Sequence, residues 1–383
     1  MNWKLGLCLL VLAACIAAAV LFLHPGPKGP APNGASVPEK STVPQPSVSG
    51  PPAGLPQGTN QLDGRLHRAL SDLGNGMASG KARQGLAELK QALAASGTNA
   101  ASAAIRRFLD SKDDGTTGIQ FKVGAHGALD GAPTLRTFLL DYLGQTDPAA
   151  AAACAREVLA TSQSADEWAV ALRNLAAGDS SADGRALLEQ KTSELLQRQD
   201  WQQDPSVGYL EAFDAAVYLG GTNLVPVLGG LVQKKDNQAV AHAAFLALDR
   251  LVLAEPAQIL QALETDPNTM QGREMTRADY FARADVRDPQ QRQVLENYLL
   301  NPRIGPGEIA QFAGIFPNAN YMISANLLTP APTPDPAGLR ARDAESLSAV
   351  QQWLTDPRFA TIRPQLERIQ NRLLEFARQA AAK

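Results

Sequence analysis

Three carboxylates stand close together at Asp110, Asp113 and Asp114, and a glycine follows them, which is a grouping that Ca²⁺-binding loops use. An EF-hand loop that started at Asp110 would place Lys112 at its third ligand position. It would also place Phe121 where the bidentate glutamate belongs, so two main ligands are wrong. The pattern therefore predicts a solvated loop at the end of a helix and no metal site.

A glycine-rich stretch over residues 74–82 has Gly80 and Lys81 in the order of a phosphate-binding loop. Such a loop needs its first glycine where Asn75 stands, and a serine or threonine where Ala82 stands. The stretch is therefore expected to be a turn between helices, and the sequence predicts no nucleotide or other cofactor.

The histidines do not support zinc or nucleophilic chemistry. The chain has four, at His24, His67, His126 and His242, and none of them shows a zinc-ligand spacing. No Gly-x-Ser-x-Gly elbow accompanies them to supply a serine nucleophile. His242 stands in an Ala-rich helix and is expected to be packed or half-exposed. The sequence therefore predicts no catalytic residue.

Four side chains are instead candidates for contact with a partner. Trp201 lies between Asp200 and a polar stretch, which favours an exposed position for its large ring. His126 lies in a glycine-rich turn and is expected to be exposed. Arg368 and Arg372 belong to a C-terminal segment in which arginine and lysine outnumber glutamate. This mildly basic face would suit an acidic partner or lipid headgroups.

The elements that must position these residues begin with an apolar N-terminus. Residues 5–23 are nineteen consecutive uncharged residues, which at about 1.5 Å each approach the roughly 30 Å of a bilayer core. We interpret residues 1–23 as an uncleaved single-pass anchor in a bacterial inner membrane, with the rest of the chain in the periplasm. The alternative is a lipoprotein signal, because residues 12–15 resemble a lipobox; Cys15 would then carry the lipid.

A proline-rich tether follows over residues 24–60. It contains ten prolines and little apolar bulk, so it is expected to remain unfolded and to act as an extended spacer. The whole chain is 45% hydrophobic with a net charge of −3, which predicts a folded body and excludes a polybasic nucleic-acid binder. Beyond the anchor Cys154 is the sole cysteine, so neither an intrachain disulfide nor a Cys-type zinc site can form there.

Patterns of period 3.6 predict helices from residue 61 onward. Clear apolar stripes fall within residues 210–217, 224–232 and 240–251. Asp-Pro pairs, in which aspartate would cap a helix that starts with proline, occur at 147–148, 204–205, 266–267, 288–289, 335–336 and 356–357. Alternation near residues 118–130 indicates at most one short β-hairpin. The predicted fold class is all-α.

Residues 215–228, AAVYLGGTNLVPVL, resemble the HEAT-type helical repeat, in which one helix closes on Leu-Gly and its partner opens with an apolar-Pro-x-Leu run. Comparable corners recur at intervals of about 32, 44 and 32 residues, near the length of two-helix repeats. The resemblance extends over residues 134–265 and implies an irregular α-solenoid of antiparallel helix pairs. An irregular helical bundle is the alternative.

This interpretation divides the chain into five parts. After the anchor and the tether come a helical-repeat body over residues 61–317, a proline-rich loop over residues 318–336 and two C-terminal helices over residues 337–383. The last helix is expected to bury Leu366, Ile369, Leu373 and Phe376.

Anchor, spacer and stacked helices together favour a membrane-tethered extracytoplasmic scaffold that binds other envelope proteins and has no catalysis of its own. One alternative is a folding helper for a secreted enzyme, because the order of parts and residues 121–143 are similar to those of bacterial lipase chaperones. The chain departs from that family's Arg-x-x-Phe-Asp-Tyr pattern, because after Arg136 the last three places hold Leu139, Leu140 and Asp141.

A third class of function is an enzyme that acts on envelope polymers, which needs two carboxyl groups as acid and base. The carboxylates available for it are Asp110, Asp113, Asp114 and Asp141. Their spacing singles out no pair, so the sequence favours a protein that is not an enzyme.

Overall fold

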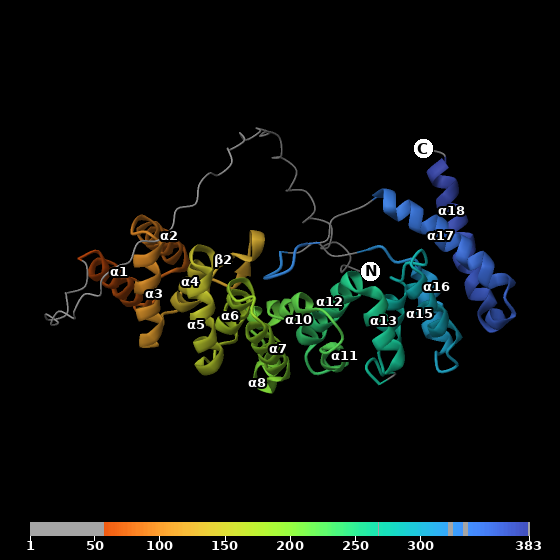
Figure 1. The fold of residues 1–383 in the computed structure, drawn as a ribbon, viewed down its shortest axis with the longest axis horizontal. Coiled ribbons are helices and arrows are strands. Elements are labelled where there is room, and N and C mark those ends of the chain that lie inside the picture. Colours follow the sequence, from red (N-terminus) through yellow and green to blue (C-terminus); the bar gives the residue numbers. More distant parts are fainter. Residues whose placement is uncertain (1–56, 267, 321–324, 332–335, 382–383) are drawn as a thin grey trace, which may run out of the picture. The chain divides into compact units, whose positions relative to one another are not determined.

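The structure, a computed structural model, describes residues 57–266, 268–320, 325–331 and 336–381. In these residues the fold is all-α apart from one small hairpin, as the sequence predicts (Figure 1). The first helix starts at Gln57, so the last four residues of the predicted tether are helical. The predicted anchor and the remainder of the tether lie outside the described residues. No helix in the described ranges has the length and apolarity that crossing a membrane requires.

Most of the described elements follow one another with short connections, and the longest connection joins α16 to α17. The α-helices are α1 (Gln57–Gly74), α2 (Ser79–Ala95), α3 (Thr98–Ser111), α4 (Leu135–Thr146), α5 (Pro148–Thr161), α6 (Ala165–Gly178), α7 (Ala182–Gln197), α8 (Gln199–Gln203), α9 (Val207–Glu211), α10 (Asp214–Leu219), α11 (Val225–Val232), α12 (Gln238–Ala254), α13 (Pro256–Thr265), α14 (Glu274–Phe281), α15 (Pro289–Leu300), α16 (Pro306–Ile315), α17 (Pro336–Thr355) and α18 (Arg363–Ala381). The remaining elements are the 3-10 helices η1 (Ala125–Gly127) and η2 (Pro357–Ile362) and the strands β1 (Lys122–Val123) and β2 (Leu129–Gly131).

Aspartate before proline starts α5, α15 and η2 in the predicted way. The carboxylates that accept hydrogen bonds from the first turns of these helices belong to Asp147, Asp288 and Asp356. The prediction is wrong for Asp204 and Asp266, which instead follow the last residues of α8 and α13. After Asp204, the cap of the next helix is Ser206, so the proline precedes the cap. Asp335 lies outside the described residues.

The predicted apolar stripes become buried helix faces, with one difference. The second and third stripes form α11 and α12, whereas the first is divided between α9 and α10. Ala212 and Phe213 interrupt the helix, yet both are buried, so the stripe stays in the core across the break.

Helices pack mainly on their near neighbours in the sequence. For example, α5 packs on α6, α11 on α12, α14 on α16 and α17 on α18, and α6 and α12 also contact the pairs before or after them. Each helix thus buries its apolar face against neighbours that are close along the chain, which is how stacked helix pairs build a continuous core.

The predicted hairpin is confirmed, in a shorter form. β1 pairs with β2 in antiparallel fashion, with Lys122 opposite Gly131. Ile119, Phe121 and Val123 are all buried, as their alternation predicts. Of these three residues only Val123 lies in a strand, because β1 starts at Lys122.

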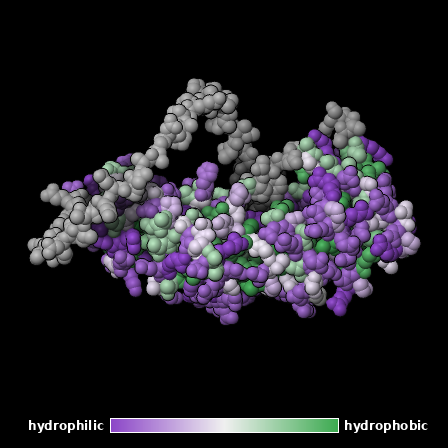
Figure 2. Space-filling model, viewed as in Figure 1, coloured by the Kyte–Doolittle hydropathy of each residue, from purple (hydrophilic) through white to green (hydrophobic). Residues whose placement is uncertain are grey.

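The two C-terminal helices are present close to their predicted bounds. Leu366, Ile369 and Leu373 of α18 are buried, but Phe376 is 46% exposed, so that prediction is wrong. Every residue from Glu375 to Gln379 is exposed, because the last turns of α18 extend beyond its packing partners. The molecular face in Figure 2 is mostly hydrophilic, with scattered apolar residues.

Candidate peptide-binding groove

A cavity of about 280 Å³ lies between α9, α10 and α12. Its apolar lining includes Leu210, Phe213, Ala243, Leu246, Ala247 and Leu253. His242 also lines it and is exposed, so the prediction of a packed or half-exposed histidine is wrong; its ring stacks on Phe245 at 6.1 Å instead of entering the core. We call the surface of α9, α10 and α12 around this cavity the groove.

A buried ion pair forms one wall of the groove. Asp214, in the first turn of α10, is 3% exposed and accepts a hydrogen bond from Nη2 of Arg250 in α12. A buried carboxylate is costly unless a cation and hydrogen-bond donors satisfy it, so this pair must be held by further contacts. Glu211 lines the same cavity, and burial together with the charge of Asp214 raises the pKa of Glu211.

Residues 325–331, which we call the return segment, supply those contacts. Oδ2 of Asp214 accepts hydrogen bonds from the backbone N–H groups of Leu328 at 2.6 Å and Thr329 at 3.0 Å, and Oδ1 accepts one from the Thr329 hydroxyl at 2.7 Å. Arg250 also donates to the Thr329 hydroxyl oxygen. In Figure 1 the return segment, drawn in blue, runs back toward the hairpin at β2. A segment 114 positions from Asp214 is thus bound by its backbone and by one side chain.

The hairpin makes a second contact with the return segment. A Cβ atom added to Gly127 would lie 2.1 Å from the carbonyl oxygen of Leu327, so the two backbones touch. Gly127 also has a φ of +75°, which L side chains rarely adopt. Leu327 is 3% exposed. Position 127 therefore requires glycine both for its conformation and for the approach of Leu327.

A buried arginine fixes Gly127 in place. Nη1 of Arg173 donates to the carbonyl oxygen of Gly127 and to Oδ1 of Asp141, both at 2.6 Å. Oδ1 of Asp141 also accepts from the backbone N–H of Leu129 at 3.1 Å. Burial raises the pKa of Asp141, and the charge of Arg173 opposes this shift. Asp141, one of the carboxylates available for the envelope-enzyme alternative, therefore positions the hairpin.

Ion pairs of the same kind recur along the described helices at similar sequence separations. Largely buried arginine–carboxylate pairs join residues 31 to 36 positions apart: Arg136–Glu167, Arg173–Asp141, Arg250–Asp214, Arg283–Asp249 and Arg277–Glu308. The pairs join α4 with α6, α10 with α12, α12 with the residues just after α14, and α14 with α16. Each of these ion pairs thus skips the helix that lies between its two elements in the sequence.

Trp201 is buried, so the prediction of an exposed ring is wrong. It is 8% exposed and packs edge-on against Trp168 at 5.3 Å and Tyr209 at 6.2 Å. The guanidinium of Arg198 covers it at 4.0 Å from the ring centre. Its polar neighbours in the sequence cover the ring instead of placing it in solvent.

The other three predicted contact residues do not line the cavity of the groove. His126 is exposed, as predicted, and its φ is 55°. Arg368 is exposed on α18. Arg372 is half-buried, and its guanidinium donates to the carbonyl oxygens of Ala313 and Gly314, each at 2.6 Å, and to that of Phe316. Arg372 therefore caps the end of α16, which leaves it poorly placed to bind a partner.

The remaining reactive groups are engaged or isolated. Cys154 is a free, buried thiol whose pKa burial raises to about 11, so little thiolate exists at neutral pH. Asp114 accepts a hydrogen bond from the backbone N–H of Arg136. Asp110 and Asp113 are exposed. The described part of the chain contains no group of three or more metal-ligating side chains placed to hold an ion.

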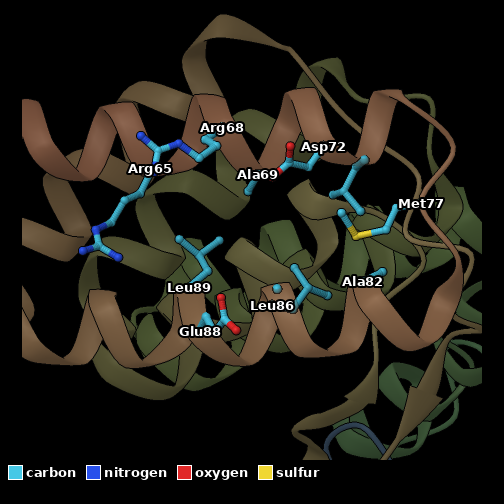
Figure 3. A pocket seen from close by; sticks show the side chains of 11 residues that line it. Arg65, Arg68, Ala69, Asp72, Met77, Ala82, Leu86, Glu88 and Leu89 are labelled. Atoms are coloured by element: carbon cyan, nitrogen blue, oxygen red, sulfur yellow. The ribbon is translucent and has the colours of Figure 1, made fainter.

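A smaller cavity of about 150 Å³ lies between α1 and α2 (Figure 3). In Figure 3, Leu86 and Leu89 extend from α2 toward α1, and Arg65, Asp72 and Glu88 also line the cavity.

The residues that matter most in the groove are absent from the sequence-based candidates. Asp214 and Arg250 each interrupt an apolar helical stripe with a charge, and this interruption is the signal that could have identified them. Gly127 and Thr329 carry no such signal, because their roles depend on contacts between distant parts of the chain. Comparison of the chain with protein-family models, with curated proteins and with solved structures finds no match.

Proposed function

We propose that this protein is a helical-repeat scaffold that binds segments of other proteins in the groove and has no catalysis of its own. The observation that carries the proposal is the return segment, which the groove binds through two backbone N–H groups and a hydroxyl. A surface that binds backbone groups of a non-helical segment has the chemistry needed to bind a peptide from another protein.

We also propose that the body is an α-solenoid of HEAT-like helix pairs. Two features support this proposal: contacts between helices that are near in the sequence, and ion pairs that recur at separations of 31 to 36 residues. Repeated pairs of this length present extended surfaces that bind other proteins in many helical-repeat proteins.

The proposed location is the outer side of a bacterial inner membrane. Residues 5–23 support an anchor, and the ten prolines of the tether support a spacer between membrane and body. Tethering would raise the local concentration of the groove near envelope proteins. A lipid on Cys15 is the alternative means of attachment.

Site-specific photocrosslinking in the native host tests the proposed function. A benzophenone amino acid at His242, an exposed residue of the groove, is compared with the same amino acid at Gln261, which is exposed on α13. We expect a crosslink from position 242 to an envelope protein and none to that protein from position 261. Equal crosslinking from both positions, or none from 242, contradicts a groove that binds partners. A single secreted enzyme as the sole crosslinked protein would support the folding-helper alternative.

A further inference from the structure

We propose that the return segment is an internal ligand of the groove, and that the partner segment which replaces it has the same chemistry. That partner is a non-helical stretch with a leucine, a second apolar residue and a serine or threonine in succession. This inference rests on the proposed function, because it specifies what the groove binds.

Asp214 determines where a bound chain lies. One of its oxygens accepts two consecutive backbone N–H groups, those of Leu328 and Thr329. Any residue except proline can offer an N–H group, so these bonds fix the position of the chain and exclude proline at two places. The other oxygen accepts the Thr329 hydroxyl, which selects serine or threonine at that place.

Leu327 gives the second element of selectivity. It is 3% exposed, so the site removes its whole side chain from water, which favours a large aliphatic residue. Its carbonyl oxygen approaches Gly127 so closely that the hairpin fixes the depth of the bound backbone. Leu328 is half-buried and packs against the core, so it requires apolar character more than a particular shape.

The groove is larger than the return segment needs. A cavity of about 280 Å³ remains beside Asn326, and the exposed side chains of His242 and Leu253 border it. Binding of residues 326–329 alone would not require this cavity. A partner segment that extends past the position of Asn326 along α12 would fill it and gain contacts that the internal ligand lacks.

Covalent attachment makes the internal ligand a strong competitor. A segment of the same chain acts at an effective concentration of roughly millimolar. The apparent affinity for a free peptide is therefore the intrinsic affinity multiplied by the fraction of molecules whose groove is open. Weakening the internal ligand without changing the groove should therefore increase the affinity for an added peptide.

Fluorescence anisotropy with the detergent-solubilised full chain tests this inference. The probe is a labelled peptide with the sequence of residues 325–331, Ala-Asn-Leu-Leu-Thr-Pro-Ala. We expect the double variant Leu327→Ala and Thr329→Val to bind it roughly tenfold or more tightly than the unchanged chain. Adding Asp214→Asn should abolish the gain. Equal binding by the unchanged chain and the double variant, or no effect of Asp214→Asn, overturns the proposal.

Matched peptides test the role of the backbone. N-methylation at the position of Leu328 removes an N–H group that binds Asp214, whereas N-methylation at Ala331 removes one with no described partner in the groove. Only the first should prevent binding. Equal binding of the two peptides contradicts recognition by Asp214.

A second measurement does not depend on the stability of any variant. Excess peptide added to the unchanged chain should raise hydrogen exchange at the amides of Leu328 and Thr329, because those amides lose Asp214 when the segment is displaced. If exchange at these amides does not rise at saturating peptide, the proposal is overturned. A dimer at the assay concentration also overturns it, because a second copy of the chain would then occupy the groove. A crosslink from His242 combined with failed peptide binding would leave the proposed function intact and reject this inference alone.

Discussion

Asp141, Asp166 and Asp214 each accept a hydrogen bond from a backbone N–H group that is distant in the sequence, those of Leu129, Gly208 and Leu328. Asp141 and Asp214 also pair with Arg173 and Arg250, whereas Asp166 also accepts from the Ser206 hydroxyl. With these donors each carboxylate holds a distant segment against a helix. This use of charge explains why buried carboxylates occur in a protein for which we propose no catalysis.

Asp179 provides a pH-dependent test of this use of carboxylates. The Ser181 hydroxyl, followed by Arg156, lowers its pKa to about 2 from 3.8. Because the folded-state pKa lies below the ordinary value, its stabilising contribution is complete above about pH 4 and is lost as the pH falls toward 2. We expect Asp179→Asn to lower the urea midpoint at pH 6 and to approach the midpoint of the unchanged chain as the pH falls toward 2.

A variant at Ser181, which caps α7, provides the control for that prediction. Ser181→Ala removes the hydroxyl that makes the largest contribution to the low pKa of Asp179. The pH dependence should therefore shrink in this variant while Asp179 itself remains. A midpoint difference between Asp179→Asn and the unchanged chain that stays constant from pH 6 to pH 2 would contradict the assignment.

At the scale of elements, helices could be predicted from the sequence because they carry their own period and several also carry their own cap. Asp147 and Ser164 cap α5 and α6 with their own side chains, so the signal is local. The exposure of Trp201 could not be predicted, because Arg198 and Trp168 cover it only in the folded chain. The binding of the return segment could not be predicted either, because its contacts also form only in the folded chain.

The contact between hairpin and return segment gives a prediction at this scale. Gly127→Ala should destabilise the protein by about 1–3 kcal/mol more than Gly272→Ala, measured by chemical denaturation. Both glycines have a φ of +75°, so in both variants an L side chain must adopt a left-handed φ. Only at Gly127 would the new Cβ atom meet the Leu327 carbonyl, since nothing lies within 4 Å at Gly272.

Hydrogen exchange separates the effect of backbone strain from the effect of the clash with the Leu327 carbonyl. Gly127→Ala should also increase exchange at the amides of Leu328 and Thr329, because the segment can no longer seat against the hairpin. Gly272→Ala should leave those amides protected. Equal protection in the two variants would mean that Gly127 does not determine how the return segment binds.

At the scale of the whole described body, most contacts join helices that are close in the sequence, and the return segment is a long-range exception. In such an arrangement stability is roughly a sum of helix-pair terms and neighbour interfaces. The return segment adds a link between the hairpin, α10 and the C-terminal part of the body. Its release would therefore remove a long-range constraint while each neighbouring interface stays intact.

Breaking one buried ion pair should consequently destabilise the protein locally. Asp249→Ala leaves Arg283 buried without its partner, so we expect a loss of about 3–5 kcal/mol in the free energy of opening α12 and α14. Hydrogen exchange should rise in those helices and stay unchanged in α1–α3, because stacked pairs transmit stability only to neighbours. Asp236→Ala, at an exposed pair with Lys234, should cost less than about 1 kcal/mol. A uniform rise in exchange from α1 to α16 after Asp249→Ala would show that the body unfolds as a single unit, which would contradict the solenoid that we propose.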